Sequence, residues 1–254
     1  MPRCDVAVAT RNSRIHYLMV KLLKKLGVTF VLCTPDDNDC KSAKVVVTTD
    51  GESERVAKDG LVVVEDTFDP DTTAIEIMLR LLDMPEPSQV VVGVDPGMQF
   101  GLAVVANGTP IYTRTVQSPP GAAEKTHQWT AHLQHNRRTE ILIRVGVGSR
   151  LYSALFLREI RSIPKDFNVE LVDERHTTRV GKSDQSSAVL IAARKGRPVT
   201  EDDLVLDVKQ GYVKSLKQLF TRLTDGARTL STAEAQAILL DETTVDGILT
   251  KSNH

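Results

Sequence analysis

Hydrophobic and polar residues follow two different periods along the first part of the chain. Short apolar runs with the length of buried strands recur at CDVAVA (4–9), TFVLCT (29–34), AKVVVTTD (43–50) and LVVVED (61–66). Between the first two runs, apolar residues return every three or four positions, as on one face of a helix: Ile15, Leu18, Met19, Leu22, Leu23 and Leu26. A second helix is predicted over TTAIEIMLRLLDM (72–84). Strands that alternate with helices predict a small α/β, Rossmann-like domain over residues 1–86.

The pattern changes after MPEPSQ (84–89), whose two prolines indicate a linker. Strands are predicted at 90–94 and 100–105, and Asn107-Gly108 between two strand-like runs is a strong hairpin signal. Three antiparallel strands are therefore expected from residue 90 to about 117. A fourth strand in TEILIRVGVGS (139–149), a helix at 150–162, a fifth strand in NVELVDE (168–174) and a helix in SDQSSAVLIAARKGR (183–197) complete the pattern. This is the element order of the ribonuclease H fold, predicted here over residues 90–203.

The remaining residues, 204–254, are predicted to form a helical C-terminal extension. YVKSLKQLFTRL (212–223) is amphipathic, and Ser231 with Glu234 three residues later makes a capping box. The expected class is thus α/β, with a small α/β domain, a ribonuclease H-like domain and a helical tail.

Composition and charge narrow the range of partners. No apolar run approaches the roughly 20 residues of a transmembrane helix. The three cysteines (Cys4, Cys33 and Cys40) are odd in number and lack CxxC spacing, so reduced thiols in a cytoplasmic protein are expected rather than a disulfide framework. The net charge is −1, yet residues 90–200 hold 15 Lys/Arg against 9 Asp/Glu. A basic middle permits a polyanionic partner, although a solvated surface explains the same charges.

Three motifs in the second segment resemble a known family. VGVDPGMQFGLAVV (92–105) is similar to the opening strand motif of RuvC-like and YqgF-like nucleases of the ribonuclease H superfamily. VELVDERHTT (169–178) resembles the YqgF-type DERxTT motif, and DQSSAVLIAARKG (184–196) resembles the last helix of that family. The resemblance covers roughly residues 90–200. It implies three catalytic acids that also hold metal: Asp95, Glu174 or its neighbour Asp173, and Asp184.

Phosphodiester hydrolysis gives these acids a chemical reason. Two Mg²⁺ or Mn²⁺ ions about 4 Å apart stabilise charge on the attacking and leaving oxygens. Such hard cations prefer carboxylate oxygens over Cys or His, so acids from several strands are required. The resemblance therefore implies a two-ion site.

Each acid also has a purely structural explanation. Asp95 could simply begin the Pro96-Gly97 turn. Asp173 and Glu174 could be solvated charges that pair with Arg175. Asp184 could be an N-cap or a first-turn acid that complements the helix dipole.

The chain departs from the family pattern in two places. RuvC-type enzymes carry a glutamate on the fourth strand, where this chain has Arg144, Gly146 and Gly148. The fifth-strand acid would have to stand in, and in a 3-2-1-4-5 sheet it lies two strands from Asp95, about 9–10 Å away. The second departure is the short interval 179–183 between DERHTT and Asp184, where the YqgF pattern has an extra helix.

Basic residues near these motifs are candidate contacts to nucleic-acid phosphates. They are Arg137, Arg138, Arg175, Arg179, Lys182, Arg194, Lys195 and Arg197. Cations at a helix end, such as Arg194 and Lys195, are also explained by the helix dipole.

The first functional hypothesis is a metal-dependent, structure-specific nuclease. RuvC-like relatives resolve four-way DNA junctions as dimers and YqgF-like relatives are linked to ribosomal RNA processing, so branched DNA, precursor RNA and a homodimer are all expectations. The second hypothesis is a nucleic-acid-binding or scaffold protein that keeps the fold without the activity, which the missing fourth-strand acid favours. A sugar-kinase or actin-like ATPase ranks last, because no second copy of the meander is found. No membrane partner is expected.

Overall fold

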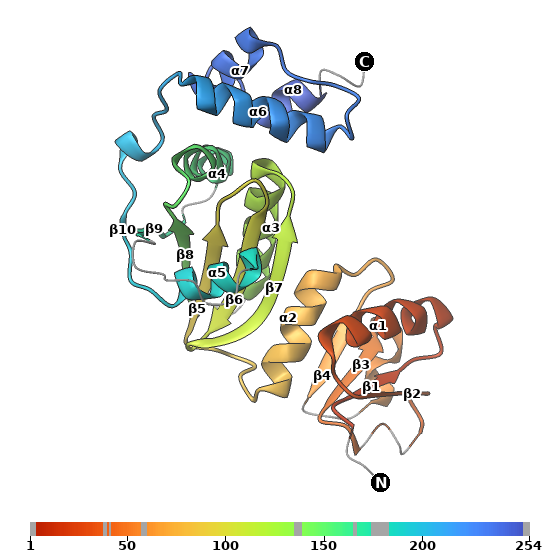
Figure 1. Cartoon of the computed structure of the whole chain (residues 1–254). Coiled ribbons are helices and arrows are strands. Elements are labelled where there is room, and N and C mark those ends of the chain that lie inside the picture. Colours follow the sequence, from red (N-terminus) through yellow and green to blue (C-terminus); the bar gives the residue numbers. More distant parts are fainter. Residues whose placement is uncertain are drawn as a thin grey trace. The chain divides into compact units, whose positions relative to one another are not determined.

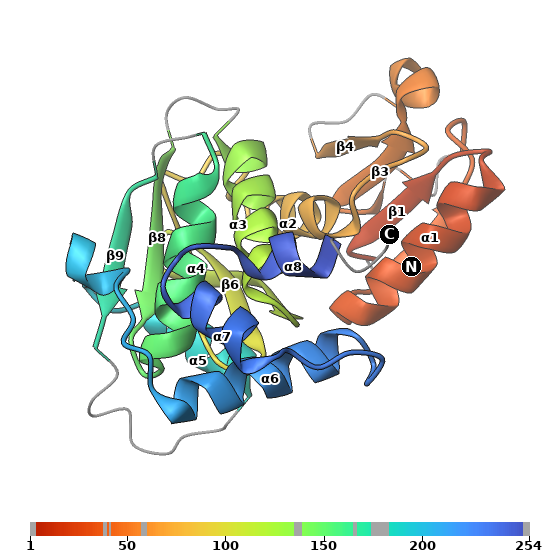
Figure 2. The same cartoon turned by 90° about the horizontal axis from the view of Figure 1, so that it is seen from above.

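The computed structural model describes residues 4–37, 40, 42–56, 60–134, 139–164, 167–173 and 183–250. The chain forms two compact units, Met1–Pro87 and Ser88–His254, and the boundary falls within the segment MPEPSQ. Figures 1 and 2 show the elements of each unit from two directions. The mixed α/β class expected from the sequence is confirmed.

The first unit is built on a four-stranded parallel sheet with the order β2-β1-β3-β4. Its strands are β1 (Val6–Ala9), β2 (Phe30–Cys33), β3 (Val45–Thr49) and β4 (Leu61–Val64). Its helices are α1 (Ser13–Leu26), the 3-10 helix η2 (Asp50–Arg55) and α2 (Pro70–Leu81). Every strand lies in a segment where the hydrophobic pattern predicts it, and both α-helices overlap their predicted segments, α2 beginning two residues earlier than expected.

The two faces of this sheet carry different residues. Val6, Val8, Val45 and Val47 share one face by strand alternation and are fully buried. On the opposite face, a small cluster joins Ala7, Ala9, Cys33 and Val46 to three residues from connections, namely Cys40, Ala43 and Val56. That face is therefore covered by the connections that follow β2 and β3.

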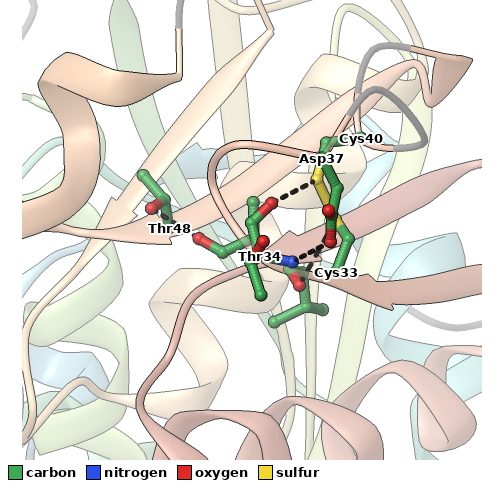
Figure 3. The surroundings of a disulfide bond; sticks show 7 residues. Cys33, Thr34, Asp37, Cys40 and Thr48 are labelled. Carbon is green, nitrogen blue, oxygen red and sulfur yellow. Dashed lines mark hydrogen bonds between the residues drawn. A yellow bond between two sulfur atoms is a disulfide. The ribbon is translucent and has the colours of Figure 1, made fainter.

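A disulfide bond joins Cys33, at the end of β2, to Cys40 in the following connection, with the Cα atoms 6.2 Å apart (Figure 3). The expectation of three reduced cysteines is wrong, and Cys4 is the free cysteine. The spacing of the cysteines in the sequence did not predict this disulfide, because the bond depends on a turn between the two residues. Asp37 accepts a hydrogen bond from the Thr34 amide at 2.8 Å, and the chain turns there and returns toward Cys33.

The second unit is built on a six-stranded mixed sheet with the order β10-β9-β8-β5-β6-β7. The first three strands form the predicted antiparallel meander, and β8 and β9 run parallel to β5. Asn107 and Gly108 have φ of 47° and 80°, which confirms the tight hairpin turn. The strands are β5 (Gln89–Asp95), β6 (Phe100–Ala106), β7 (Thr109–Val116), β8 (Glu140–Gly146), β9 (Val169–Val172) and β10 (Arg197–Pro198).

Helices cover both faces of this sheet. One face is packed by α3 (Pro119–Leu133) and α4 (Arg150–Ser162), where Phe100 of β6 meets the rings of Tyr152 and Phe156. The other face is packed by α5 (Asp184–Ala192). The sequence pattern did not predict α3. Its Ser-Pro-Pro-Gly start is typical of a turn, but Ser118 serves as N-cap and the prolines occupy the first helical positions.

The C-terminal residues pack on the same unit as three helices: α6 (Gln210–Leu223), α7 (Thr232–Leu239) and α8 (Val245–Thr250). The predicted capping box of Ser231 and Glu234 is present. Arg158 of α4 anchors the end of α7, because its guanidinium donates to the carbonyl oxygens of Ile238 and Leu239. The same guanidinium also donates to the carbonyl oxygen of Leu204. Within the described ranges, no helix has the length and apolar character to cross a membrane.

Candidate functional site

Asp95 is the last residue of β5, and its strand partners place it on the α5 face of the sheet. It pairs directly with Gly101 of β6, and the register of β5 with β8 places Gly146 beside it on the other side. Directly paired residues project to the same face. The row through Asp95 therefore offers glycine on both neighbouring strands.

Asp184 reaches the same place because α5 begins directly on Gly101. A Cβ atom built on Gly101 would overlap the backbone oxygen of Asp184 and lie 3.1 Å from the Asp184 Cβ. Since directly paired Cβ positions are roughly 5 Å apart, the Cβ atoms of Asp95 and Asp184 are separated by roughly 9 Å at most. The structure thus brings these two predicted acids together at one end of the sheet.

The start of α5 is fixed by its neighbouring residues. Ser183 is the N-cap, so Asp184 is a first-turn residue rather than the cap. Gln185 exchanges hydrogen bonds with Thr113 and Thr115 of β7, at 3.2 and 3.3 Å. Sequence reasoning missed Gln185, and its signal would have been an amide beside an acid at the start of a helix.

A second glycine lets α5 approach the middle of β5. A Cβ atom on Gly93 would overlap the backbone oxygen of Ala188 and lie 2.8 Å from the Cβ of Ala192. The helix therefore packs directly against the backbone of β5 and β6. The positions of both acids follow from backbone contacts as well as from side-chain packing.

The fifth-strand acids are only partly described. Val172, the last residue of β9, lies in the same row of the sheet as Gly146, and the exposed Asp173 follows it. Glu174 lies outside the described residues. Of the predicted acids, the structure therefore places Asp95, Asp173 and Asp184.

Arg144 lies on β8, the fourth predicted strand, and also faces α5. It pairs with Gly93, so it lies one row further into the sheet than Asp95. Its Nε donates to Glu170 of β9 at 2.9 Å, and its Nη1 donates to the carbonyl oxygen of Ala192 at 2.7 Å. Burial raises the pKa of Glu170, but hydrogen bonds from Arg144 and the Gly196 amide outweigh it and leave the pKa below its usual value. This pair links β8, β9 and the end of α5.

The basic residues predicted to contact phosphates differ in their surroundings. Arg197 forms two hydrogen bonds with the buried Asp203, at 2.7 and 2.6 Å, so its guanidinium is already paired with a carboxylate although the side chain is exposed. Arg194 donates to the carbonyl oxygen of Asp173 at 3.4 Å, and Lys195 is exposed. The other five, Arg137, Arg138, Arg175, Arg179 and Lys182, lie outside the described residues.

The donor set around Asp95 fits a hard cation only in part. Asp95 and Asp184 offer carboxylate oxygens, the ligands that Mg²⁺ and Mn²⁺ prefer. Among the residues that the structure describes, no group of three or more His, Cys, Asp or Glu is placed to hold a metal ion.

The first unit has its own polar cluster at the carboxyl ends of its strands. Glu52 of η2 accepts hydrogen bonds from the Thr10 hydroxyl, the Arg11 amide at 2.9 Å and the Thr49 hydroxyl at 2.7 Å. Burial raises the pKa of Glu52, yet these donors together hold it below its usual value. In open parallel sheets this edge is where ligands bind, but here the donors of the cluster are used by Glu52.

A hollow of about 640 Å³ lies at the other end of the second sheet. It is lined by residues of α4, the amino end of β9 and the segment after β10, both apolar (Leu157, Ile160, Phe167) and charged (Arg161, Glu201). Because β9 runs parallel to β5, this hollow is at the edge opposite to Asp95. It does not belong to the site of the two acids.

Comparison with known proteins identifies a similarity for the first unit. Residues 5–82 match the family model of a response regulator receiver-like domain, which is less than a third of the chain. The four parallel strands of this unit lie within that match. No curated protein matches the chain.

Among solved structures, two of the Ppx/GppA phosphatase of Aquifex aeolicus align with most of the chain. The type II variant is 12% identical, with 91% of this chain and 72% of that chain covered, at a TM-score of 0.17. A second structure of the Aquifex aeolicus PPX-GPPA enzyme is 11% identical, with 91% and 73% covered, at a TM-score of 0.16. These TM-scores are too low to indicate a common fold.

Proposed function

We propose that the second unit is a metal-dependent nuclease that hydrolyses phosphodiester bonds in branched DNA or structured RNA. The observation that carries this proposal is the meeting of Asp95 and Asp184 at one end of the sheet, through the contact of α5 with Gly101. The two acids are 89 positions apart in the sequence, yet both lie on the α5 face.

The topology supports the same proposal. The order β7-β6-β5-β8-β9 corresponds to the 3-2-1-4-5 order that the resemblance to RuvC-like and YqgF-like nucleases implies. Asp95 ends the central strand, and Asp184 begins the helix on the face that Asp95 shares. Asp173 and Glu174, which follow β9, remain candidates for the third acid.

Asp95 and Asp184 would hold Mg²⁺ or Mn²⁺ through their carboxylate oxygens. When bound, such ions stabilise negative charge on the attacking and leaving oxygens of the phosphodiester. The chain's own contribution is to fix both acids through backbone packing, with Gln185 holding the first turn of α5 against β7.

A binding or scaffold protein without activity is the alternative, and one observation favours it. Gly146 stands beside Asp95 on the fourth strand, so this neighbouring position supplies no ligand. The number of acids that meet at the site decides between the two functions.

Calorimetric titration of Mn²⁺ into the full chain tests the proposal, with Asp95→Asn and Asp184→Asn as variants. Glu140→Gln is the matched control, since Glu140 begins β8 at the opposite end of the sheet. We expect binding to the wild type and to the control, and an affinity at least about tenfold lower in both aspartate variants because each loses a hard anionic ligand.

Cleavage of four-way junction DNA and structured RNA follows for the protein that binds. Cleavage by the wild type and its loss in Asp95→Asn would support the nuclease. Absence of Mn²⁺ binding by the wild type and by every variant, even with nucleic acid present, would reject the nuclease and leave the binding or scaffold function.

A further inference from the structure

The turn that follows Asp95 is held from the C-terminal helices. Arg222 of α6 donates through Nη2 to the carbonyl oxygen of Met98 in this turn, and through the same atom to the carbonyl oxygen of Gln117 at 2.6 Å. Met98 lies between β5 and β6, whereas Gln117 follows β7. A single guanidinium therefore bridges two backbone segments at the end of the sheet that carries Asp95.

Neighbouring side chains reinforce this junction. The Tyr152 hydroxyl of α4 lies 3.3 Å from the sulfur of Met98, and Gln99 donates to the Gln117 side chain at 3.1 Å. Burial raises the pKa of Tyr152, and the nearby charge of Arg222 opposes that rise. The turn after Asp95 is thus in contact with α4, α6 and the end of β7.

The position of Arg222 on α6 makes this contact specific. Leu216, Leu219 and Phe220 are buried and anchor the helix to its unit. Arg222 lies on a flank of that buried side and its Nε atom is buried, whereas Lys214 is on the exposed side. Charge-assisted hydrogen bonds to carbonyl oxygens are stronger than neutral ones, so this bridge restrains the turn.

We propose that Arg222 is a positioning residue that makes the helical extension part of the Asp95 site. It holds the turn after β5 and the end of β7 at a fixed separation, which sets the place of Asp95 relative to the start of α5. The effect on metal binding rests on the function proposed above, whereas the effect on the turn does not.

Hydrogen–deuterium exchange of the full chain measures the effect on the turn. Arg222→Met keeps an apolar stem and removes the donors, and Lys214→Met is the control on the same helix. In Arg222→Met we expect exchange to become roughly tenfold faster in the peptides that cover residues 95–102 and 115–119, since the loss of such bonds favours local opening. Residues 140–146 of β8 should exchange as in the wild type, and Lys214→Met should change neither region.

Arg222→Lys provides a second variant that retains the charge and the stem. Lysine lacks the planar fork, so it should restore protection only in part. Should Arg222→Met fail to fold, faster exchange at 95–102 in Arg222→Lys carries the same conclusion. Unchanged exchange at 95–102 in the variants that fold would overturn the proposal.

Titration of Mn²⁺ into the same variants separates this inference from the proposed function. Weaker binding in Arg222→Met than in Lys214→Met, by roughly threefold or more, is expected if the turn positions Asp95. Equal binding by the two variants would overturn the positioning role even where exchange is faster. A wild-type protein that binds no Mn²⁺ would reject the nuclease, and the exchange result would then decide on the structural bridge alone.

Discussion

At the scale of single residues, two glycines determine where the candidate site forms. Gly93 and Gly101 lie on neighbouring strands, and α5 rests on both without any intervening side chain. The close approach places the first turn of α5 next to the row of Asp95. A glycine is required at these positions because of the space that the helix backbone occupies.

Substitution of Gly101 by alanine should displace the start of α5. The added methyl group would overlap the backbone of Asp184, which cannot move aside without shifting the helix. We expect a loss of roughly 2–3 kcal/mol in the free energy of unfolding, as is usual for overpacked sites. Urea denaturation of the variant measures this loss.

Gly211→Ala is the matched control for that experiment. Gly211 lies near the start of α6 and a Cβ atom there would contact nothing within 4 Å. Alanine is the better helix former, so this variant should be as stable as the wild type or slightly more stable. Equal stability of the two variants would contradict the close packing of α5.

At the scale of elements, α4 connects the sheet of the second unit to the C-terminal helices. Phe156 of α4 packs on Phe100 of the sheet. Arg158 of α4 donates hydrogen bonds to carbonyl oxygens of α7 and of the segment after η3 (Glu201–Asp203). The next residue, Glu159, is half-buried near Asp241 and Asp246. Burial and these two carboxylates raise the pKa of Glu159 to about 7.

The raised pKa predicts that the second unit loses stability as the pH rises. The Glu159 carboxyl has a pKa of 4.5 in the unfolded chain and about 7 in the folded one. As the pH rises from 4.5 to about 7, the unfolded chain releases this proton more readily, so the free energy of unfolding falls over that range. Glu159→Gln should therefore be more stable than the wild type at pH 8, on the order of 1–2 kcal/mol after allowance for solvent screening. The difference should be several-fold smaller at pH 5 than at pH 8, because pH 5 is only just above the ordinary pKa of 4.5.

Urea denaturation of both proteins at pH 5 and pH 8 measures this effect. Glu242→Gln, at an exposed glutamate beside Asp241, controls for the change in net charge. A stability difference that is the same at both pH values would show that Glu159 is not the group responsible.

At the scale of the whole molecule, the chain has two units with separate cores and different dependence on covalent bonds. The disulfide lies in the first unit, Met1–Pro87, whereas the second unit, Ser88–His254, contains neither Cys33 nor Cys40. The bond closes a short loop over the small-residue face of the sheet. Each unit should therefore respond separately to reduction.

Calorimetry of the full chain should show that a reductant shifts only one of two unfolding transitions. Loss of a disulfide that spans 7 positions costs about 2–3 kcal/mol, or roughly 10–20 °C for a unit of this size. The Cys33→Ser/Cys40→Ser variant should match the reduced wild type and be insensitive to reductant. A shift of both transitions, or of neither, would contradict this assignment.

The sequence predicted the elements more completely than it predicted the contacts. Strict periodicity located every strand of the first unit and the meander of the second, because alternation and Asn-Gly turns are local signals. The helix α3 was missed because Pro-Pro-Gly at a helix start has the composition of a turn. The disulfide and the pairing of Arg197 with Asp203 depend on how separate segments return to each other, which no local pattern records.

The candidate site was predictable as a set of acids but not as a geometry. Asp95 and Asp184 were identified from motifs, whereas Gly93, Gln185 and Arg222 were not. Their roles come from contacts between α5, β7 and α6 and the central hairpin, over separations of 70 residues or more. Such long-range contacts follow only from the folded chain.

The connection over the small-residue face of the first sheet has a consequence for the lifetime of the protein. Where thiols are kept reduced, the Cys33–Cys40 bond is lost, and a cost of about 2–3 kcal/mol raises the unfolded fraction of that unit roughly 30- to 150-fold. Proteases that act on opened chains follow that fraction. The rate at which this protein is degraded would then report the redox state of its surroundings.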